Sequence, residues 1–235
     1  MKQIDGLSFF FPAYNEEANI NSTVKKALEY LPVVANNFEV IVVDDGSKDN
    51  TQNLVSQIIK TNKNVRLIRH PVNKGYGGAL TSGWYQSKYS WIAFNDSDGQ
   101  FDIRQLDRML KYVGEADLII GFRENRKDPL IRKLNAKAWG MLNKILFGLN
   151  VKDIDCAFKL IKKDVFEKVD RLETSGAFIS SELLIKAKKA GFKIVEVPVT
   201  HYPRTGGRQT GASFKVILRA FKELILMYPK LVGSK

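Results

Sequence analysis

The chain has 235 residues, of which 44% are hydrophobic, and it carries a formal net charge of +12 with a pI near 9.6. This length and composition suffice for a packed core and argue against a disordered chain. The positive charge suits nucleic acid, anionic lipid or phosphorylated substrates as partners without choosing among them, and a soluble protein that is merely basic is a fourth possibility.

The single cysteine, Cys156, cannot form an internal disulfide, and no neighbouring base would activate it as a nucleophile. We expect it to be buried. The first residues do not resemble a signal peptide, and no apolar run reaches the roughly 20 residues that span a bilayer. These features predict a cytoplasmic protein whose membrane contact, if it has one, is peripheral.

Short β-branched runs alternate with amphipathic stretches through the first half of the chain, which is typical of βαβ units and a mostly parallel, buried sheet. The predicted strands are Leu7–Phe11, Phe38–Val43, Val65–Arg69, Trp91–Asn95 and Leu118–Ile120. The helices predicted between them span about residues 16–30, 51–60, 77–87 and 103–113. We expect an open, wound α/β sheet with helices on both faces, which binds ligands at the carboxyl ends of its strands.

The second half begins with a basic amphipathic pattern from about Pro129 to Phe147, followed by a shorter stretch of mixed α and β character. A loop rich in glycine and cations, 204–213, then precedes a basic amphipathic C-terminal helix over residues 214–235. Apolar stripes of this kind usually face a core, although flanking cations also suit a membrane surface. We expect one domain over residues 1–235, with 1–122 and 123–213 as its two halves.

The strongest local signal follows the fourth predicted strand, where Asp96, Asp98 and Gln100 occupy alternate positions. Carboxylate and amide oxygens are the ligands that Mg²⁺ and Mn²⁺ prefer. Aspartate is also common in turns for conformational reasons, so the pattern alone is weak. A calcium-binding EF-hand loop fits less well, because its sixth position requires glycine and here holds Phe101.

Other strand ends add weight to a metal site. Asp44 and Asp45 end the second predicted strand, and Pro12, Tyr14 and Glu16 follow the first. Because parallel strands end at the same edge of a sheet, these residues should face one crevice, where carboxylates accept hydrogen bonds from a base or ribose. A metal in that crevice would neutralise a diphosphate leaving group.

Five motifs resemble those of family 2 glycosyltransferases, in the same order along the chain. They are Pro12–Glu16, Asp44–Ser47, Asn73–Gly75, Asp96–Gln100 and Gly121–Arg123. Within that family the chain is similar to the polyprenyl (dolichyl) phosphate sugar synthases, such as the mannose synthases. The resemblance covers most of the chain.

The resemblance implies a GT-A fold and assigns roles to the matching residues. The nucleotide would be bound by Pro12, Tyr14, Glu16, Asp44, Asp45 and Lys74. The Mg²⁺ or Mn²⁺ ion would be bound by Asp96, Asp98 and Gln100. The acceptor phosphate would be bound by Arg123, Arg132, Arg204, Arg208 and Ser213. The catalytic set would be Asp98, Arg123, Arg132, Arg208 and Glu182, with Glu182 on the acceptor side.

One motif departs from the family pattern. The segment 153–159 keeps Asp153 and Phe158, but Ala157 and Lys159 stand where the family commonly has glycine and arginine. This departure leaves the identity of the acceptor and of the sugar open.

The resemblance implies inverting transfer of a sugar, in the first place mannose from GDP-mannose, to a polyprenyl phosphate at a membrane surface. A separate membrane-anchoring subunit is a further possible partner. Transfer of glucose from UDP-glucose and transfer to a sugar hydroxyl are the alternatives. A lipid phosphate is already nucleophilic near neutral pH, because its second pKa is about 6, whereas a hydroxyl acceptor would need a carboxylate base.

Other classes of protein fit the sequence less well. Glycoside hydrolysis by a carboxylate pair gives no role to a metal triplet or to phosphate-binding arginines. A dinucleotide-binding oxidoreductase would need glycine or alanine where Leu80 stands, in the fingerprint that begins at Gly75. No motif of a nucleic-acid-binding module is present, so we expect no nucleic-acid partner. His70 and His201 are far apart in sequence, and we expect them to pack or cap locally.

Overall fold

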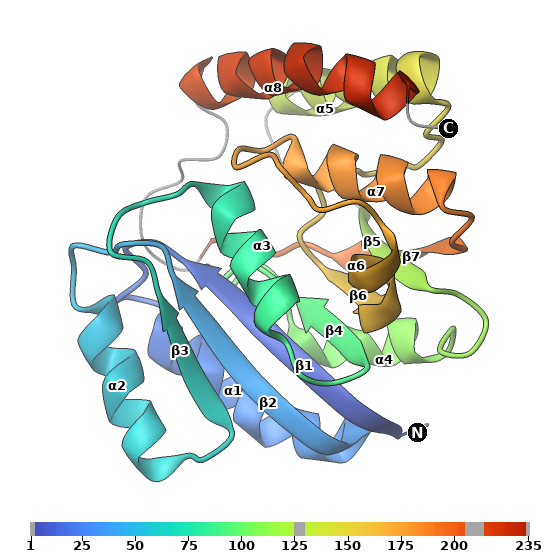
Figure 1. Cartoon of the computed structure of the whole chain (residues 1–235). Coiled ribbons are helices and arrows are strands. Elements are labelled where there is room, and N and C mark those ends of the chain that lie inside the picture. The colour runs from blue at the N-terminus through green and yellow to red at the C-terminus, as the bar shows by residue number, and fades with distance from the viewer. Residues whose placement is uncertain (1–2, 125–129, 205–213, 234–235) are drawn as a thin grey trace.

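The computed structural model describes residues 3–124, 130–204 and 214–233, which form one seven-stranded sheet covered by helices (Figure 1). The order of the strands across the sheet is β3-β2-β1-β4-β6-β5-β7. The strands are β1 (Ile4–Ala13), β2 (Ala35–Asp44), β3 (Val65–Arg69), β4 (Trp91–Phe94), β5 (Leu118–Glu124), β6 (Lys159–Lys162) and β7 (Ile194–Thr200). Strand β6 runs antiparallel to both of its neighbours, and all other pairs are parallel.

Strands β1 and β2 are the longest in the sheet and lie in its amino-terminal half, buried on both faces. This burial explains their continuous apolar runs, Phe9–Phe11 and Val40–Val43, because a strand covered on both faces has no polar side to alternate with. Their parallel register pairs Ala13 with Asp44, so the two strands end at the same edge of the sheet.

Helices cover both faces of the sheet. The first core packs α1 (Ile20–Val34), α2 (Thr51–Thr61), the 3₁₀ turn η1 (Ile103–Gln105) and α4 (Leu106–Leu110) against one face. The second core packs α3 (Tyr76–Gln86), α6 (Lys163–Lys168) and α7 (Ile179–Lys189) against the other. The phenylalanines of β1 serve both cores, since Phe9 and Phe11 point into the first and Phe10 into the second.

Two further helices, α5 (Leu130–Phe147) and α8 (Phe214–Gly233), lie side by side beyond α7 and form an outer layer (Figure 1). Aromatic contacts join them: the rings of Trp139 and Phe221 are 5.4 Å apart between centroids, and those of Phe147 and Tyr228 are 5.8 Å apart. Trp139 also meets Phe178, at the start of α7, edge to face. None of the helices in the described ranges is both long and apolar enough to cross a membrane.

The predicted α/β architecture is confirmed, including the open, mostly parallel sheet and the long helices near both ends of the second half. The helix expected from residue 16 begins only at Ile20, because residues 14–19 form a loop in which Asn15 has a φ of 55°. The helix expected over 103–113 is wrong as a single element: η1 and the short α4 replace it. The sequence did not single out β6 and β7 as separate strands.

Candidate active site

The carboxyl ends of β1, β2 and β4 meet at one edge of the sheet and bring three polar loops together. The Asp45 backbone N–H donates to the Ala13 carbonyl at 2.9 Å, and the Ser97 hydroxyl donates to the Pro12 carbonyl at 2.8 Å. The Glu16 backbone N–H donates to the Thr51 hydroxyl at 2.9 Å. Hydrogen bonds therefore hold together the three loops that the strand order predicts to lie close, and Pro12 contributes its carbonyl to the joint between β1 and the loop after β4.

Asp45 is buried and its carboxylate organises the loop that follows β3. Its Oδ1 accepts from the Lys74 backbone N–H at 2.8 Å and lies 2.6 Å from Nδ1 of buried His70, while its Oδ2 accepts from the Gly75 N–H at 2.9 Å. Gly75 has a φ of 92°, and a Cβ there would lie 2.5 Å from the Ser175 carbonyl oxygen, so this turn requires glycine. Asp45 holds the backbone of Lys74 and Gly75 near the end of β2, the Lys74 side chain is exposed, and His70 packs locally as expected.

Asp44 has one carboxylate oxygen that no group in the described part of the protein satisfies. Its side chain is 1% exposed; Oδ1 accepts from the Ser47 N–H at 3.0 Å, and Oδ2 is buried without a hydrogen-bond partner. A buried carboxylate oxygen without a donor is costly, so a ligand N–H or O–H at this position would bind favourably. Tyr14, on the loop that follows β1, is 40% exposed.

Asp96 and Asp98 are close enough to influence each other's ionisation. Burial, together with the charge of Asp98, raises the pKa of Asp96 to about 7. The pKa of Asp98 is raised as well, chiefly by burial. The Tyr76 hydroxyl, from the first turn of α3, donates to Asp96 Oδ1 at 3.1 Å. Two partly desolvated carboxylates of this kind attract a cation, because a positive charge offsets both desolvation and mutual repulsion.

A guanidinium supplies positive charge at this site. Arg204, in the segment after β7, places Nη2 2.6 Å from Glu16 Oε1 and Nη1 3.3 Å from Asp98 Oδ2. Arg204 was predicted to bind the acceptor phosphate, and here it joins the carboxylates predicted to bind the nucleotide and the metal. Gln100 donates its side-chain amide to the Tyr202 carbonyl at 3.1 Å, which ties the same segment to the loop after β4.

The donor atoms at this edge fit a hard divalent cation only in part. Within residues 3–124, 130–204 and 214–233, no group of three or more histidine, cysteine, aspartate or glutamate side chains is arranged to hold a metal ion. The oxygens of Asp96, Asp98 and Gln100 are nevertheless of the type that Mg²⁺ and Mn²⁺ prefer, and the two carboxylates repel each other. The set suits such an ion once the partners of Asp98 and Gln100 rearrange.

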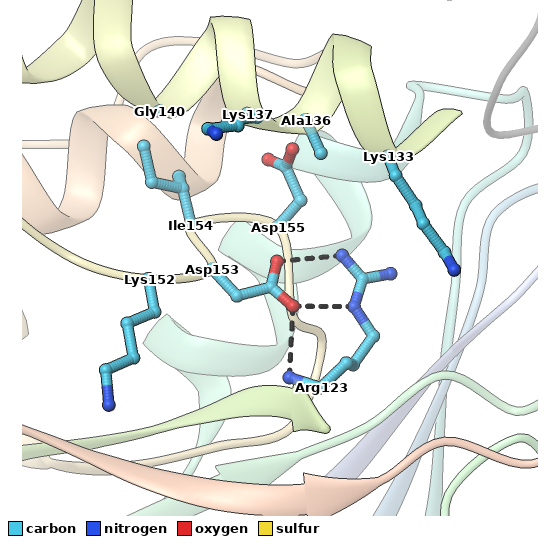
Figure 2. A pocket seen from close by; sticks show the side chains of 9 residues that line it. All are labelled: Arg123, Lys133, Ala136, Lys137, Gly140, Lys152, Asp153, Ile154 and Asp155. Carbon is cyan, nitrogen blue, oxygen red and sulfur yellow. Dashed lines mark hydrogen bonds and ion pairs between the residues drawn. The ribbon is translucent and has the colours of Figure 1, made fainter. Parts of the chain in front are cut away.

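A cationic pocket of about 390 Å³ lies between α5 and the segment before β6 (Figure 2). At its base Arg123 forms a bidentate ion pair with Asp153, with Nε–Oδ2 and Nη2–Oδ1 distances of 2.7 and 2.8 Å. Its remaining polar lining is Lys133, Lys137, Lys152 and Asp155, with the two lysines of α5 on one wall. Because the lining residues include four cationic and two acidic side chains, the pocket favours an anion.

Lys159 is fully buried and contacts the turn that contributes Asp153, Ile154 and Asp155 to this pocket. Its Nζ donates to the Ile154 carbonyl at 3.1 Å and also to the Cys156 carbonyl, so it fixes the turn that carries Asp153 and Asp155. Burial lowers the pKa of Lys159. Cys156 is buried as expected, and burial raises its pKa to about 12, so it is not a reactive thiolate at neutral pH.

Glu182 is completely buried in α7, and its carboxylate holds a loop of the protein itself. It accepts from the backbone N–H groups of Glu173 and Thr174, both at 2.9 Å, from the Thr174 hydroxyl at 2.6 Å and from Lys186 at 2.8 Å. The Ser175 carbonyl in this loop accepts from the Gly77 N–H at the start of α3. Glu182 thus supports the base of α3, from which Tyr76 reaches Asp96.

The remaining predicted residues have different positions. Arg132 is half-buried on α5, one residue before Lys133 of the pocket. Arg208 and Ser213 lie outside the described residues. Sequence reasoning missed Lys133 and Lys137, although their spacing of four on an expected helix places them on one face. It also missed Tyr76, for which no sequence signal was available.

The sequence is similar to those of known glycosyltransferases. The sequence model of glycosyl transferase family 2 matches residues 8–170. The glycosyltransferase AglD of Haloferax volcanii is 30% identical over 84% of this chain, which spans 33% of AglD. The undecaprenyl-phosphate mannosyltransferase of Micrococcus luteus is 28% identical, with 83% of each chain covered. The dolichyl-phosphate beta-glucosyltransferase ALG5D of Trichomonas vaginalis is 29% identical over 82% of this chain and 64% of its own length.

Among solved structures, glucosyl-3-phosphoglycerate synthase from Mycobacterium tuberculosis, in complex with Mn²⁺, UDP and glucosyl-3-phosphoglycerate, has a similar fold. The TM-score is 0.74 at 18% sequence identity, over 98% of this chain and 81% of that one. At this identity the likeness concerns the fold.

Proposed function

The chain belongs to glycosyl transferase family 2 and has a GT-A fold, and on that basis we propose that it transfers a sugar from a nucleotide-diphosphate donor to a polyprenyl phosphate. The observation that carries this proposal is the presence of two complementary centres in one molecule. Acidic oxygen donors gather at the ends of β1, β2 and β4, and a cationic pocket lies below α5. The first suits a metal-bound diphosphate and the second a phosphate anion.

On the donor side, the unsatisfied Oδ2 of Asp44 supports binding of a base or ribose through a donated hydrogen bond, with Tyr14 packing beside the base. Asp96, Asp98 and Gln100 would hold Mg²⁺ or Mn²⁺. When bound, that ion supplies charge neutralisation for the leaving diphosphate. Of the relatives named for a lipid phosphate, the one from Micrococcus luteus is a mannosyltransferase and the one from Trichomonas vaginalis is a glucosyltransferase. We therefore propose GDP-mannose as the donor, with UDP-glucose as the alternative.

On the acceptor side, Arg123 is held by Asp153 with its guanidinium plane fixed, and Lys133 and Lys137 of α5 add positive charge to the same pocket (Figure 2). A phosphate monoester in this pocket would be oriented by these groups rather than deprotonated, since it is already largely dianionic near neutral pH. Its oxygen would attack the anomeric carbon opposite the leaving diphosphate. A single displacement of this kind inverts the anomeric configuration.

Peripheral seating at a membrane is part of the proposal, because a polyprenyl chain stays in the bilayer. The outer surfaces of α5 and α8 expose large apolar side chains, and three of them are at least 70% exposed: Ile145 at 73%, Phe214 at 74% and Ile225 at 70%. The other exposed members are Leu134, Met141, Leu218, Phe221, Leu226, Tyr228 and Val232. We name these ten residues the α5–α8 face. Large exposed apolar patches on soluble domains mark interaction sites.

The charge around the α5–α8 face suits an anionic bilayer. Lys137 and Lys144 on α5, and Lys215 and Lys222 on α8, are exposed next to its apolar residues. Amphipathic helices with this combination lie in the interface of a membrane, with the apolar side chains inserted and the cations at the headgroups. The cationic pocket is lined by α5 itself, so seating the face on a bilayer would bring the pocket near the level of lipid phosphates.

A transfer assay tests the proposal. The protein is incubated with GDP-mannose or UDP-glucose, Mn²⁺ or Mg²⁺ and a polyprenyl phosphate, and the lipid-linked sugar phosphate is isolated and its anomeric configuration determined. We expect an inverted product, and a loss of at least about 100-fold in rate for Asp98→Asn. Asp164→Asn, which removes an exposed carboxylate on α6, should act like the unsubstituted protein. Absence of lipid product with every donor, or retention of configuration, would contradict the proposal.

A further inference from the structure

Arg204 occupies a place that the proposed metal would need. Asp98 has two carboxylate oxygens, and the protein already uses both: Oδ1 accepts from the Gln100 backbone N–H at 3.0 Å, and Oδ2 faces the Arg204 guanidinium at 3.3 Å. The first contact belongs to the turn after β4 and is local. The second reaches across 106 residues of sequence and is the one that a cation from solution could replace.

The electrostatics of Arg204 explain why it lies there. Glu16 Oε1 and Asp98 Oδ2 lie 2.6 and 3.3 Å from the same guanidinium, so the two negative charges are close to each other and repel. The guanidinium bonds both, and its side chain is only 17% exposed, so solvent screens these contacts weakly. One positive charge therefore compensates two carboxylates in the absence of a metal. A divalent ion held by Asp98 would face repulsion from Arg204 in this position.

The segment that carries Arg204 is fastened independently of its side chain. The Tyr202 N–H donates to the Gln100 carbonyl at 2.9 Å, and the Thr200 N–H donates to Gln105 Oε1 at 2.6 Å. The guanidinium can thus leave Asp98 while the backbone around Tyr202 stays in place. Arginine is also well suited to bind the phosphates that arrive with a metal-bound nucleotide diphosphate.

We propose that Arg204 is an internal counter-cation of the metal site, which competes with divalent metal for Asp98 until a nucleotide diphosphate receives its guanidinium. This inference rests on the metal and donor parts of the proposed function, and it does not depend on the acceptor. Its consequence is an order of events: metal alone binds weakly, and metal and nucleotide diphosphate strengthen each other's binding. By linkage the two effects are equal in size.

Titration calorimetry with Mn²⁺ alone, and then with Mn²⁺ in the presence of saturating GDP or UDP, tests the inference without turnover. Arg204→Gln should bind Mn²⁺ alone roughly tenfold more tightly than the unsubstituted protein, because a competing, partly buried charge is removed. The gain in Mn²⁺ affinity on adding nucleotide diphosphate should shrink in the same variant. Arg204→Lys, which keeps the charge, should remain closer to the unsubstituted protein.

Arg104→Gln is the matched control, because it removes one arginine charge from an exposed pair with Asp102 and should leave Mn²⁺ affinity unchanged. A thermal melt gives a second reading: Mn²⁺ should raise the melting temperature of Arg204→Gln more than that of the unsubstituted protein. Equal or weaker Mn²⁺ binding by Arg204→Gln would overturn the inference. If all variants bind Mn²⁺ and this pattern holds while no lipid product forms, the counter-cation role stands and only the acceptor assignment fails.

Discussion

At the scale of single residues, the acidic side chains differ in how many of their carboxylate oxygens remain available to bind a ligand. Asp45 and Glu182 have carboxylates whose oxygens are taken up by backbone N–H groups and neighbouring side chains, so they hold loops in place. Asp44 keeps one unsatisfied oxygen, and Asp96 and Asp98 form a repelling pair. The resemblance assigns nucleotide, metal and acceptor-side roles to these five residues, but only hydrogen-bond geometry separates the carboxylates that hold a loop from those with an oxygen left for a ligand.

The Arg123–Asp153 pair gives a prediction at this scale. Both side chains are only 8% exposed and share two hydrogen bonds, so removing one charge leaves the other buried and uncompensated. We expect Asp153→Asn to lower the free energy of unfolding by about 2–4 kcal/mol, measured by urea denaturation. Asp155→Asn, two residues away with an exposed side chain, is the control and should cost less than about 1 kcal/mol. Equal losses in the two variants would mean that Asp153 does not hold Arg123.

At the scale of elements, α8 shows two apolar faces with different tasks. Leu224, Met227 and Leu231 are buried in the second core, Ala220 is buried as well, and the four recur at helical spacing. Glu223, on the same side, accepts from the Gly176 N–H at 2.8 Å and fastens the helix to the loop before α7. The second stripe remains exposed, although core packing already holds the helix. This exposed stripe is what a purely core-facing helix would lack.

Vesicle binding tests the exposed stripe. We expect the protein to float with vesicles that contain anionic lipid, and to bind less at high salt because the flanking lysines are screened. The double substitution Phe214→Glu and Ile225→Glu should weaken binding at least about tenfold, since two large apolar side chains no longer insert. Val33→Glu, an exposed apolar position on α1, is the control and should bind normally. Unchanged flotation of the double variant would remove the α5–α8 face as the membrane-binding surface.

For the whole molecule, the sequence predicts the amino-terminal half well, whereas in the carboxyl-terminal half it predicts α5 and α8 but not β6 and β7. Buried parallel strands such as β2 leave continuous β-branched runs, and the polar loops after them follow from the strand order. The short strand β6 and the edge strand β7 have weaker apolar patterns. In β6, the buried position 159 holds a lysine, whose charged end is satisfied by turn carbonyls. The position of Arg204 beside Asp98 depends on tertiary contacts across the whole sheet, which no local motif encodes.

One carboxylate ties together the amino-terminal half at the edge opposite the site, and it makes the stability of the molecule depend on pH. Glu39 on β2 accepts from the Ser8 hydroxyl on β1 at 2.6 Å, from the Lys88 N–H before β4 at 2.9 Å and from Arg66 on β3 at 2.8 Å. Burial opposes its ionisation, but these donors prevail and hold its pKa below the ordinary value of 4.5. Its contribution to stability is therefore complete above pH 4.5 and is lost as the pH falls through the lowered pKa.

We expect Glu39→Gln to reduce the free energy of unfolding by about 1–3 kcal/mol at pH 7, and the difference from the unsubstituted protein to narrow as the pH falls below 4.5. Urea denaturation from pH 3 to pH 8 measures the loss of stability and its change with pH. Glu29→Gln, on the exposed side of α1, is the control, and its difference in free energy of unfolding from the unsubstituted protein should not narrow at low pH. A difference that stays constant across this range would mean that the charge of Glu39 does not stabilise the sheet.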